Sequence, residues 1–460
     1  MIVIPMERKH RKRLVYLDSA RGFFTVIIIF AHSLSHLMFW DMELIPLEDV
    51  NIFAIIVLSP VIILATCAPV FVQISAVALS YNFFLDINDY ITAKNEETGD
   101  PKERPQISFK DPRLLRIVKK NLINYTVLLG ASIAHVFLFH YGLNWNNQIQ
   151  RTLLTGILET GGLSIDFEVY FQTDAIGLIA FSGLFNVGLL ILLLRKNGYY
   201  KPVRNLCILL ALIFTWYVLS PLIHSALDDV FWASLNNGQY GLTFLLKFIV
   251  GPPMSIFPNF AYGFAGIIIG MGFAQEKKRI FFRKLAIYLS IIFIGAAGIL
   301  ILIKGFTLSP EAFGLFLPIE LQALDFAVVQ IMLLLFIEVV AYSKKNKQHI
   351  HKKTRLWQRF GRITMTIYIF ESVLCILNMK WYVPLWKLLP QTSLILHLEL
   401  FVFVGMQLAL WYGIILLWEK KNFKYSVEWF MVVIRRKFME RSSAPPGKKR
   451  AQTKTDQVRK

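Results

Sequence analysis

The chain has 460 residues, of which 55% are hydrophobic and only 17% are charged. Soluble globular domains average about 25% charged residues, so this composition excludes an ordinary soluble protein and predicts a helical membrane protein with many spans. The formal net charge of +19 does not indicate nucleic-acid binding, because the basic residues are confined to particular loops. The three cysteines lie far apart in apolar stretches, which excludes a disulfide framework or a paired-cysteine metal site.

Apolar stretches of membrane-spanning length recur along the chain. They cover residues 19–40, 54–85, 121–141, 175–194, 205–225, 257–274, 285–303, 320–342, 363–379 and 396–418. The second stretch is too long for one simple span and contains Pro60 and Pro69, so we expect a short interfacial or re-entrant helix followed by a true span at 65–85. The expected fold is therefore an all-α, polytopic membrane helix bundle with about ten transmembrane helices.

The loops divide the basic residues very unequally. Of 49 lysines and arginines, 43 fall in the alternate segments that include both termini, 5 fall in the other loops, and Arg21 alone lies within a span. The positive-inside rule assigns the basic segments to the cytosol. An even number of spans, with both the N-terminus and the C-terminus cytosolic, accounts for this distribution.

Three polar segments complete the expected organisation. The basic sequence before the first span flanks an uncleaved signal anchor in our interpretation, and residues 86–111 are expected to form a polar loop. We divide the chain into a membrane domain at 1–440 and a basic cytosolic tail at 441–460. The composition of this tail predicts disorder and contact with anionic lipid.

Ionisable side chains inside spans are costly and therefore mark candidate functional sites. The predicted spans and their margins contain Arg21, His32, His36, His135, His140, His224, Asp325, Glu338, Glu371 and Glu399. Four of them lie near span ends, where a side chain can extend to water: His36, His140, Glu338 and Glu399.

The first span carries two ionisable residues on one helical face. Arg21 is expected one turn inside a helix that Asp18 or Ser19 caps, and His32 follows eleven residues later. Eleven residues make about three turns and rise roughly 16 Å, so the two side chains share a face at different depths. Arginine binds phosphate, and histidine can act as a general base near neutral pH. The alternative is that Arg21 only anchors the span and pairs with Asp18.

The sequence LDSARG at residues 17–22, with His32 at the appropriate distance, resembles the first-span motif of the transmembrane acyltransferases. This superfamily includes heparan-α-glucosaminide N-acetyltransferase and the acyltransferase 3 proteins that modify bacterial glycans. Three further segments are similar to later parts of the family pattern: APVFVQISAVALS at 68–80, GRITMTIYIFE at 361–371 and KYSVEWF at 424–430.

Two residues depart from that pattern. Ala76 follows Ser75 where the family usually has glycine, and Glu371 stands where it often has histidine or glutamine.

The resemblance implies an acyl-CoA-dependent transmembrane acyltransferase, with acetyl transfer the simplest case. The acyl group would pass from cytosolic acetyl-CoA, or another acyl-CoA, to a hydroxyl or amine of a sugar or glycan across the membrane. His32 is then the general base and Glu371 a second catalytic residue. Residues assigned to acyl-CoA are Asp18, Arg21, Ser75 and Arg362, and those assigned to the acceptor are His36 and His135. Arg362 is equally consistent with a charge that only sets topology.

The partners expected from this resemblance are acyl-CoA, a sugar or glycan acceptor and membrane lipids, with no nucleic acid. A homodimer is left open. The expected location is the cell membrane of a prokaryote.

Two other functions remain open. A proton-coupled transporter or lipid flippase also uses buried His, Asp and Glu side chains, and Gly251-Pro-Pro253 together with the segment from Pro60 to Pro69 partly resemble its broken spans. A family member that binds acyl-CoA or lipid without turnover is the third possibility, suggested by Ala76 and Glu371.

His32 and His36 also form an H-x-x-x-H pair, which can ligate a metal ion if a third ligand such as Asp41 converges. We expect no metal and interpret His36 as an interfacial residue or an acceptor contact. His135 is also consistent with a hydrogen-bonded core histidine.

Overall fold

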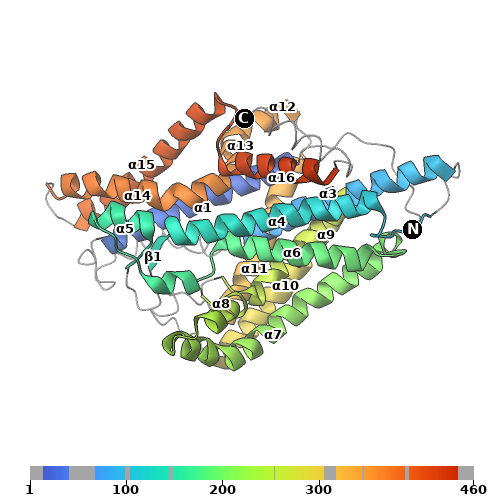
Figure 1. The fold of residues 1–460 in the computed structure, drawn as a ribbon, viewed down its shortest axis with the longest axis horizontal. Helices are drawn as coiled ribbons and strands as arrows, with labels where there is room; N and C mark the ends of the chain where they lie inside the picture. Colours follow the sequence, from blue (N-terminus) through green and yellow to red (C-terminus); the bar gives the residue numbers. More distant parts are fainter. Residues whose placement is uncertain are drawn as a thin grey trace, which may run out of the picture.

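Long apolar helices dominate the computed structural model of the protein, which describes residues 14–40, 68–98, 104–143, 149–252, 254–304, 318–343, 347–388 and 393–443. Nine helices within these ranges are long and apolar enough to cross a membrane, and one bent pair of helices raises the number to ten. The predicted all-α, multi-pass membrane bundle is thereby confirmed (Figure 1).

The first half of the chain contributes five long helices. They are α1 (Val15–Trp40), α3 (Val70–Thr98), α4 (Pro112–Leu138), α6 (Ala175–Leu194) and α7 (Pro202–Asn236). Shorter elements connect them: β1 (Tyr141–Leu143), β2 (Ile149–Arg151), α5 (Leu153–Thr160), η2 (Phe167–Phe171), η3 (Gly198–Tyr200) and α8 (Tyr240–Ile249). The two strands pair antiparallel, with Tyr141 opposite Arg151.

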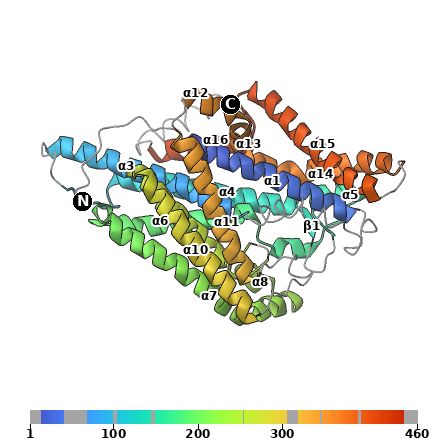
Figure 2. The same ribbon diagram turned by 180° about the vertical axis from the view of Figure 1, so that it is seen from behind.

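The second half continues the bundle and adds three shorter helices. The long elements are α9 (Ile256–Ala274), α10 (Arg279–Lys304), α11 (Ile319–Phe336) with its π-helical extension η5 (Ile337–Ala341), α14 (Thr364–Trp386) and α15 (Ser393–Glu419). The others are α12 (Lys347–Lys353), α13 (Arg355–Arg362) and α16 (Val427–Ser443). α13 meets α14 at a bend of 79°. In both views, α5 and β1 lie away from α12, α13 and α16 (Figures 1 and 2).

α3 differs most from its prediction. It continues through Thr98, well into the polar sequence that was expected to be a loop. The reason is that Ile87, Tyr90 and Ile91 are buried on one face of these turns, so packing supports a helix that hydropathy alone does not identify. The expected re-entrant helix with Pro60 lies outside the described residues.

The predicted cap of α1 is wrong. The helix begins at Val15, so Asp18 and Ser19 lie within its first turns and Arg21 lies nearly two turns inside. The Ser19 hydroxyl donates to the Val15 carbonyl at 2.9 Å, as a serine within a helix commonly does.

α1 and α13 are in backbone contact through two glycines. A Cβ atom at Gly22 would lie 1.7 Å from the Trp357 carbonyl oxygen, and a Cβ atom at Gly361 would lie 2.0 Å from the Asp18 carbonyl oxygen. Neither position can hold a larger residue unless the helices separate. The contact joins the Arg-Gly of the first span to the Gly-Arg at 361–362, two of the segments that carry the family resemblance.

The contact leads to a stability prediction. We expect Gly22→Ala to destabilise the folded protein by about 1–3 kcal/mol, because the added methyl group must push α13 away. Thermal unfolding in detergent, followed by tryptophan fluorescence, measures the change. Gly130→Ala is the matched control, since a Cβ atom at Gly130 in α4 has no atom within 4 Å. If both variants unfold at the wild-type temperature, the contact does not constrain the helices.

Membrane orientation is tested by cysteine labelling in a variant whose three cysteines are replaced by serine. The charge distribution predicts that an impermeant maleimide labels Gly162→Cys and Asn237→Cys in intact cells, because both precede spans that return to the cytosol. Thr98→Cys and Lys352→Cys should react only after permeabilisation. All four positions are exposed, so absence of labelling reports the side of the membrane rather than burial. Labelling of Thr98→Cys in intact cells would contradict the predicted orientation.

Candidate active site

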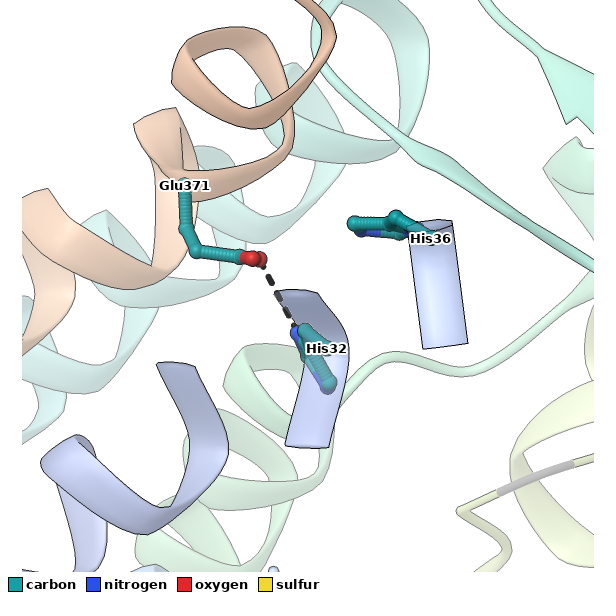
Figure 3. Close-up of side chains that lie close together, drawn as sticks. All are labelled: His32, His36 and Glu371. Carbon is teal, nitrogen blue, oxygen red and sulfur yellow. Dashed lines mark hydrogen bonds and ion pairs between the residues drawn. The ribbon is translucent and has the colours of Figure 1, made fainter. Parts of the chain in front are cut away.

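Two polar pairs connect α1 to α14. The hydroxyls of Thr25 and Thr364 are 3.0 Å apart, and His32 Nδ1 lies 3.0 Å from Glu371 Oε2 (Figure 3). On each helix the two residues are seven positions apart, which is about two turns and roughly 10 Å. α1 and α14 therefore lie in register, with the threonine pair toward their N-terminal ends and the histidine–glutamate pair about two turns later.

An apolar cavity lies between these two pairs. Its volume is about 40 Å³, and α1, α3, α6 and α14 line it. Its polar side chains are Thr25, Thr364, Tyr368 and Glu371, and its apolar walls include Ile28, Phe71, Ile176 and Ile367. The cavity thus joins a pair of hydroxyls to a histidine–carboxylate pair through hydrocarbon walls.

The carboxylate of Glu371 is held in an apolar environment. Glu371 is 3% exposed, and its Oε1 has no hydrogen-bond partner among the described residues. His32 is its partner through Oε2, and the His32 side chain is 43% exposed. If Nδ1–H donates to the carboxylate, the Nε2 nitrogen keeps its lone pair and can accept a proton.

Arg21 lies one turn before the threonine pair. The Thr25 hydroxyl donates to the Arg21 carbonyl at 2.8 Å. The Arg21 guanidinium is 3.4 Å from the Gly361 carbonyl and 4.0 Å from the Asp18 carboxylate, and its side chain is 32% exposed. These long contacts leave hydrogen-bonding capacity for an anionic group. The alternative role predicted for Arg21 was pairing with Asp18. At 4.0 Å, this contact is at the upper distance limit of an ion pair.

The other residues assigned to acyl-CoA lie around this end of the cavity in different settings. Ser75, one turn after the cavity residue Phe71, has its hydroxyl 3.2 Å from that of Tyr125. The Arg362 guanidinium stacks 5.6 Å from the centre of the Phe423 ring, and its Nε is buried without a partner among the described residues. Their roles remain predictions.

Ala76, the departure in the second-span segment, is buried against α9. A Cβ atom at Gly266 would lie 2.8 Å from the Ala76 methyl group. The alanine therefore contributes to a helix contact and leaves the cavity lining unchanged.

The two residues assigned to the acceptor are both buried. His36 is 4% exposed, its ring 6.0 Å from that of His32 and 5.0 Å from that of Tyr141, so it is not the exposed interfacial residue expected as one alternative. His135 Nδ1 lies 3.2 Å from Asp174 Oδ2, and the Tyr368 ring lies 5.2 Å from the His135 ring and 6.4 Å from the His32 ring. Contact of either residue with an acceptor remains a prediction.

A hydrogen-bonded core role also describes His135 well. The Asp174 carboxylate beside it accepts hydrogen bonds from the Ser132 hydroxyl at 2.5 Å and from the Gly177 amide at 2.8 Å. This second histidine–carboxylate pair is therefore part of the N-terminal cap of α6.

Sequence reasoning missed the residue that fixes the start of α14. Glu428 of α16 accepts hydrogen bonds from the Met365 amide at 2.7 Å and from the Thr366 hydroxyl at 2.6 Å. A carboxylate at a helix N-terminus satisfies free N–H groups and interacts favourably with the helix dipole. The only sequence signal was the Glu-Trp pair within residues 424–430. Thr25, Thr364 and Tyr368 gave none, because such residues are unremarkable within spans.

His224 shows what a structural histidine looks like in this chain. Its Nδ1 lies 3.0 Å from Asp228 Oδ1 and its Nε2 lies 3.2 Å from the Phe257 carbonyl oxygen. The Nδ1 contact lies within α7, and the Nε2 contact joins α7 to the start of α9.

Within the described residues, His32, His36 and Glu371 form a group whose ligand atoms all lie within 4.8 Å of one another.

Comparisons with known proteins found no matching family model, no matching curated protein and no matching solved structure. Function must therefore be inferred from the geometry of this site and from the sequence resemblance.

Proposed function

We propose that the chain is an integral membrane acyltransferase that moves an acyl group, in the simplest case acetyl, from acyl-CoA to a hydroxyl or amine of a sugar or glycan. The observation that carries this proposal is the His32–Glu371 pair at one end of an apolar cavity that begins at the threonine pair, one turn from Arg21. Acyl-CoA would approach from the cytosolic side and the acceptor from the other side of the membrane.

The dimensions of this arrangement support the proposal. Arg21 and His32 are separated by roughly 16 Å along α1, a length comparable to an extended pantetheine arm. An anionic nucleotide would stay at Arg21, where a charged group is less costly than deep in the membrane. The cavity of about 40 Å³ must widen to admit the arm, which would pass the threonine pair. The Thr25 and Thr364 hydroxyls donate to backbone carbonyls, so their oxygens would accept from the amide N–H groups of the arm. The thioester would then lie beside His32.

The chemical step follows from the histidine tautomer. His32 Nε2 accepts the proton of the acceptor hydroxyl or amine as its oxygen or nitrogen bonds to the acyl carbon. The carbon–sulfur bond then breaks, and the leaving thiolate takes the proton from the imidazolium. Glu371 holds the ring in orientation through Nδ1 and stabilises the transient positive charge, as the carboxylate of a catalytic triad does.

The role of His32 is tested by replacement with glutamine, which offers a donor and an acceptor but no base. We expect His32→Gln to lower turnover by about 100-fold or more, because general base catalysis contributes that much. Acyl-CoA binding should remain, since the phosphate contacts lie roughly 16 Å away. The measurement is free thiol released by protein in nanodiscs from acetyl-CoA with a panel of sugars.

The control for this experiment is His224→Gln, which alters a histidine–carboxylate pair outside the cavity and should retain turnover. Substantial turnover by His32→Gln would contradict the assignment and leave His36 or Glu371 as the base. A carrier would instead move its substrate with no thiol released.

Arg21→Ala should weaken acyl-CoA binding by about 10- to 150-fold, because a charge-assisted phosphate contact contributes roughly 1.5–3 kcal/mol. Binding of a pantetheine fragment that lacks the phosphates should not change. Arg113→Ala is the matched control, since that arginine forms an exposed ion pair with Glu97, and such pairs contribute little. Equal losses for CoA and for the pantetheine fragment would show that Arg21 has only a structural role.

A further inference from the structure

The group formed by His32, His36 and Glu371 has the composition and the spacing of a transition-metal site. His32 and His36 are four residues apart on α1, which directs both rings to one side of the helix, and Glu371 reaches them from α14 (Figure 3). Their ligand atoms lie within 4.8 Å of one another. Two histidines at i and i+4 with a glutamate from another segment form the His₂Glu set of catalytic zinc sites.

The unpartnered oxygen of Glu371 supports a cationic ligand at this point. Oε2 has His32, but Oε1 is buried and has no partner among the described residues, in a cavity whose walls are mostly apolar. A buried carboxylate that is incompletely compensated is costly. A divalent cation between the carboxylate and the two rings would compensate the charge and use all three side chains.

We propose that His32, His36 and Glu371 bind one divalent transition-metal ion of the Zn²⁺ type. Imidazole nitrogen with one carboxylate favours Zn²⁺ and Co²⁺ over Mg²⁺ and Ca²⁺, which prefer oxygen ligands alone. Tetrahedral ligands with bonds near 2.0–2.1 Å are separated by about 3.3–3.4 Å. The ligand atoms lie within 4.8 Å of one another, so the most widely spaced pair must approach by up to about 1.4 Å, while the 3.0 Å contact of His32 with Glu371 must open slightly.

An ion at this site also changes the chemistry of His32. Coordination through Nδ1 moves the ring proton to Nε2, and coordination through Nε2 uses its lone pair directly. In both cases the ring has no nitrogen that can accept a proton. Inhibition of acyl transfer by Zn²⁺ is the consequence, and this consequence rests on the proposed function. Metal binding itself does not.

The test is a Co²⁺ titration of metal-free protein in nanodiscs, followed by the visible d–d absorption of the bound ion. We expect one saturable site per chain, an intense band typical of four- or five-coordinate Co²⁺, and displacement by Zn²⁺ but not by Mg²⁺. His36→Gln and Glu371→Gln, which keep the size of the side chain or nearly so, should each weaken binding by about 10-fold or more.

His224→Gln is the matched control and should bind Co²⁺ as the wild type does, since His224 is none of the three proposed ligands and its ring contacts Asp228, Ser255 and the Phe257 carbonyl. Size-exclusion profiles and circular dichroism of each variant confirm that it is folded. Wild-type affinity in both His36→Gln and Glu371→Gln, or no saturable band, overturns the proposal.

Thiol-release assays with and without Zn²⁺ separate the two proposals. Acyl transfer by protein that does not bind Co²⁺ would overturn the proposed metal site and support the proposed acyltransferase. Co²⁺ binding by protein that shows no acyl transfer would overturn the proposed acyltransferase and support the proposed metal site. Zn²⁺ inhibition that is reversed by a chelator supports both.

Discussion

The close contact of α1 with α13 is the constraint on which the site depends. Gly22 and Gly361 let the two backbones touch, and α14 begins three residues after Gly361. Because the start of α14 is fixed there, its residues are in register with those of α1. Equal intervals of seven residues then place threonine opposite threonine and histidine opposite glutamate. Glu428 reinforces this register by capping the first turn of α14 from α16.

The membrane explains why this register matters energetically. A carboxylate such as Glu371, 3% exposed, needs a partner at a defined position, because a buried charge without a partner is costly. A shift of α14 by one residue would rotate Glu371 by about 100° around its helix and separate it from His32. The backbone contact of α1 with α13 therefore determines whether His32 can compensate the charge of Glu371 further along α1 and α14.

Sequence reasoning succeeded where the signal lies within one helix and failed where it depends on two. Hydropathy and charge predicted the bundle, and the eleven-residue spacing of Arg21 and His32 follows from helical geometry alone. The partnership of His32 with Glu371 links residues 339 positions apart, and only packing establishes it. The helical extension of α3 to Thr98 was missed because its buried face alternates with charges that lower its mean hydropathy.

The negative charge of the buried Glu371 carboxylate must be compensated, and this requirement links the two proposals for this site. A proton on His32 and a metal ion among the three ligands both place positive charge beside the same buried carboxylate, so they compete for one position. The proton can leave to a reacting group, whereas the ion is held by three ligands at once. A site built to stabilise a transient imidazolium is therefore also suited to a divalent cation. Unless acyl-CoA or acceptor separates His36 from the pair, selectivity for the proton must come from the approach of up to about 1.4 Å between ligand atoms that an ion requires.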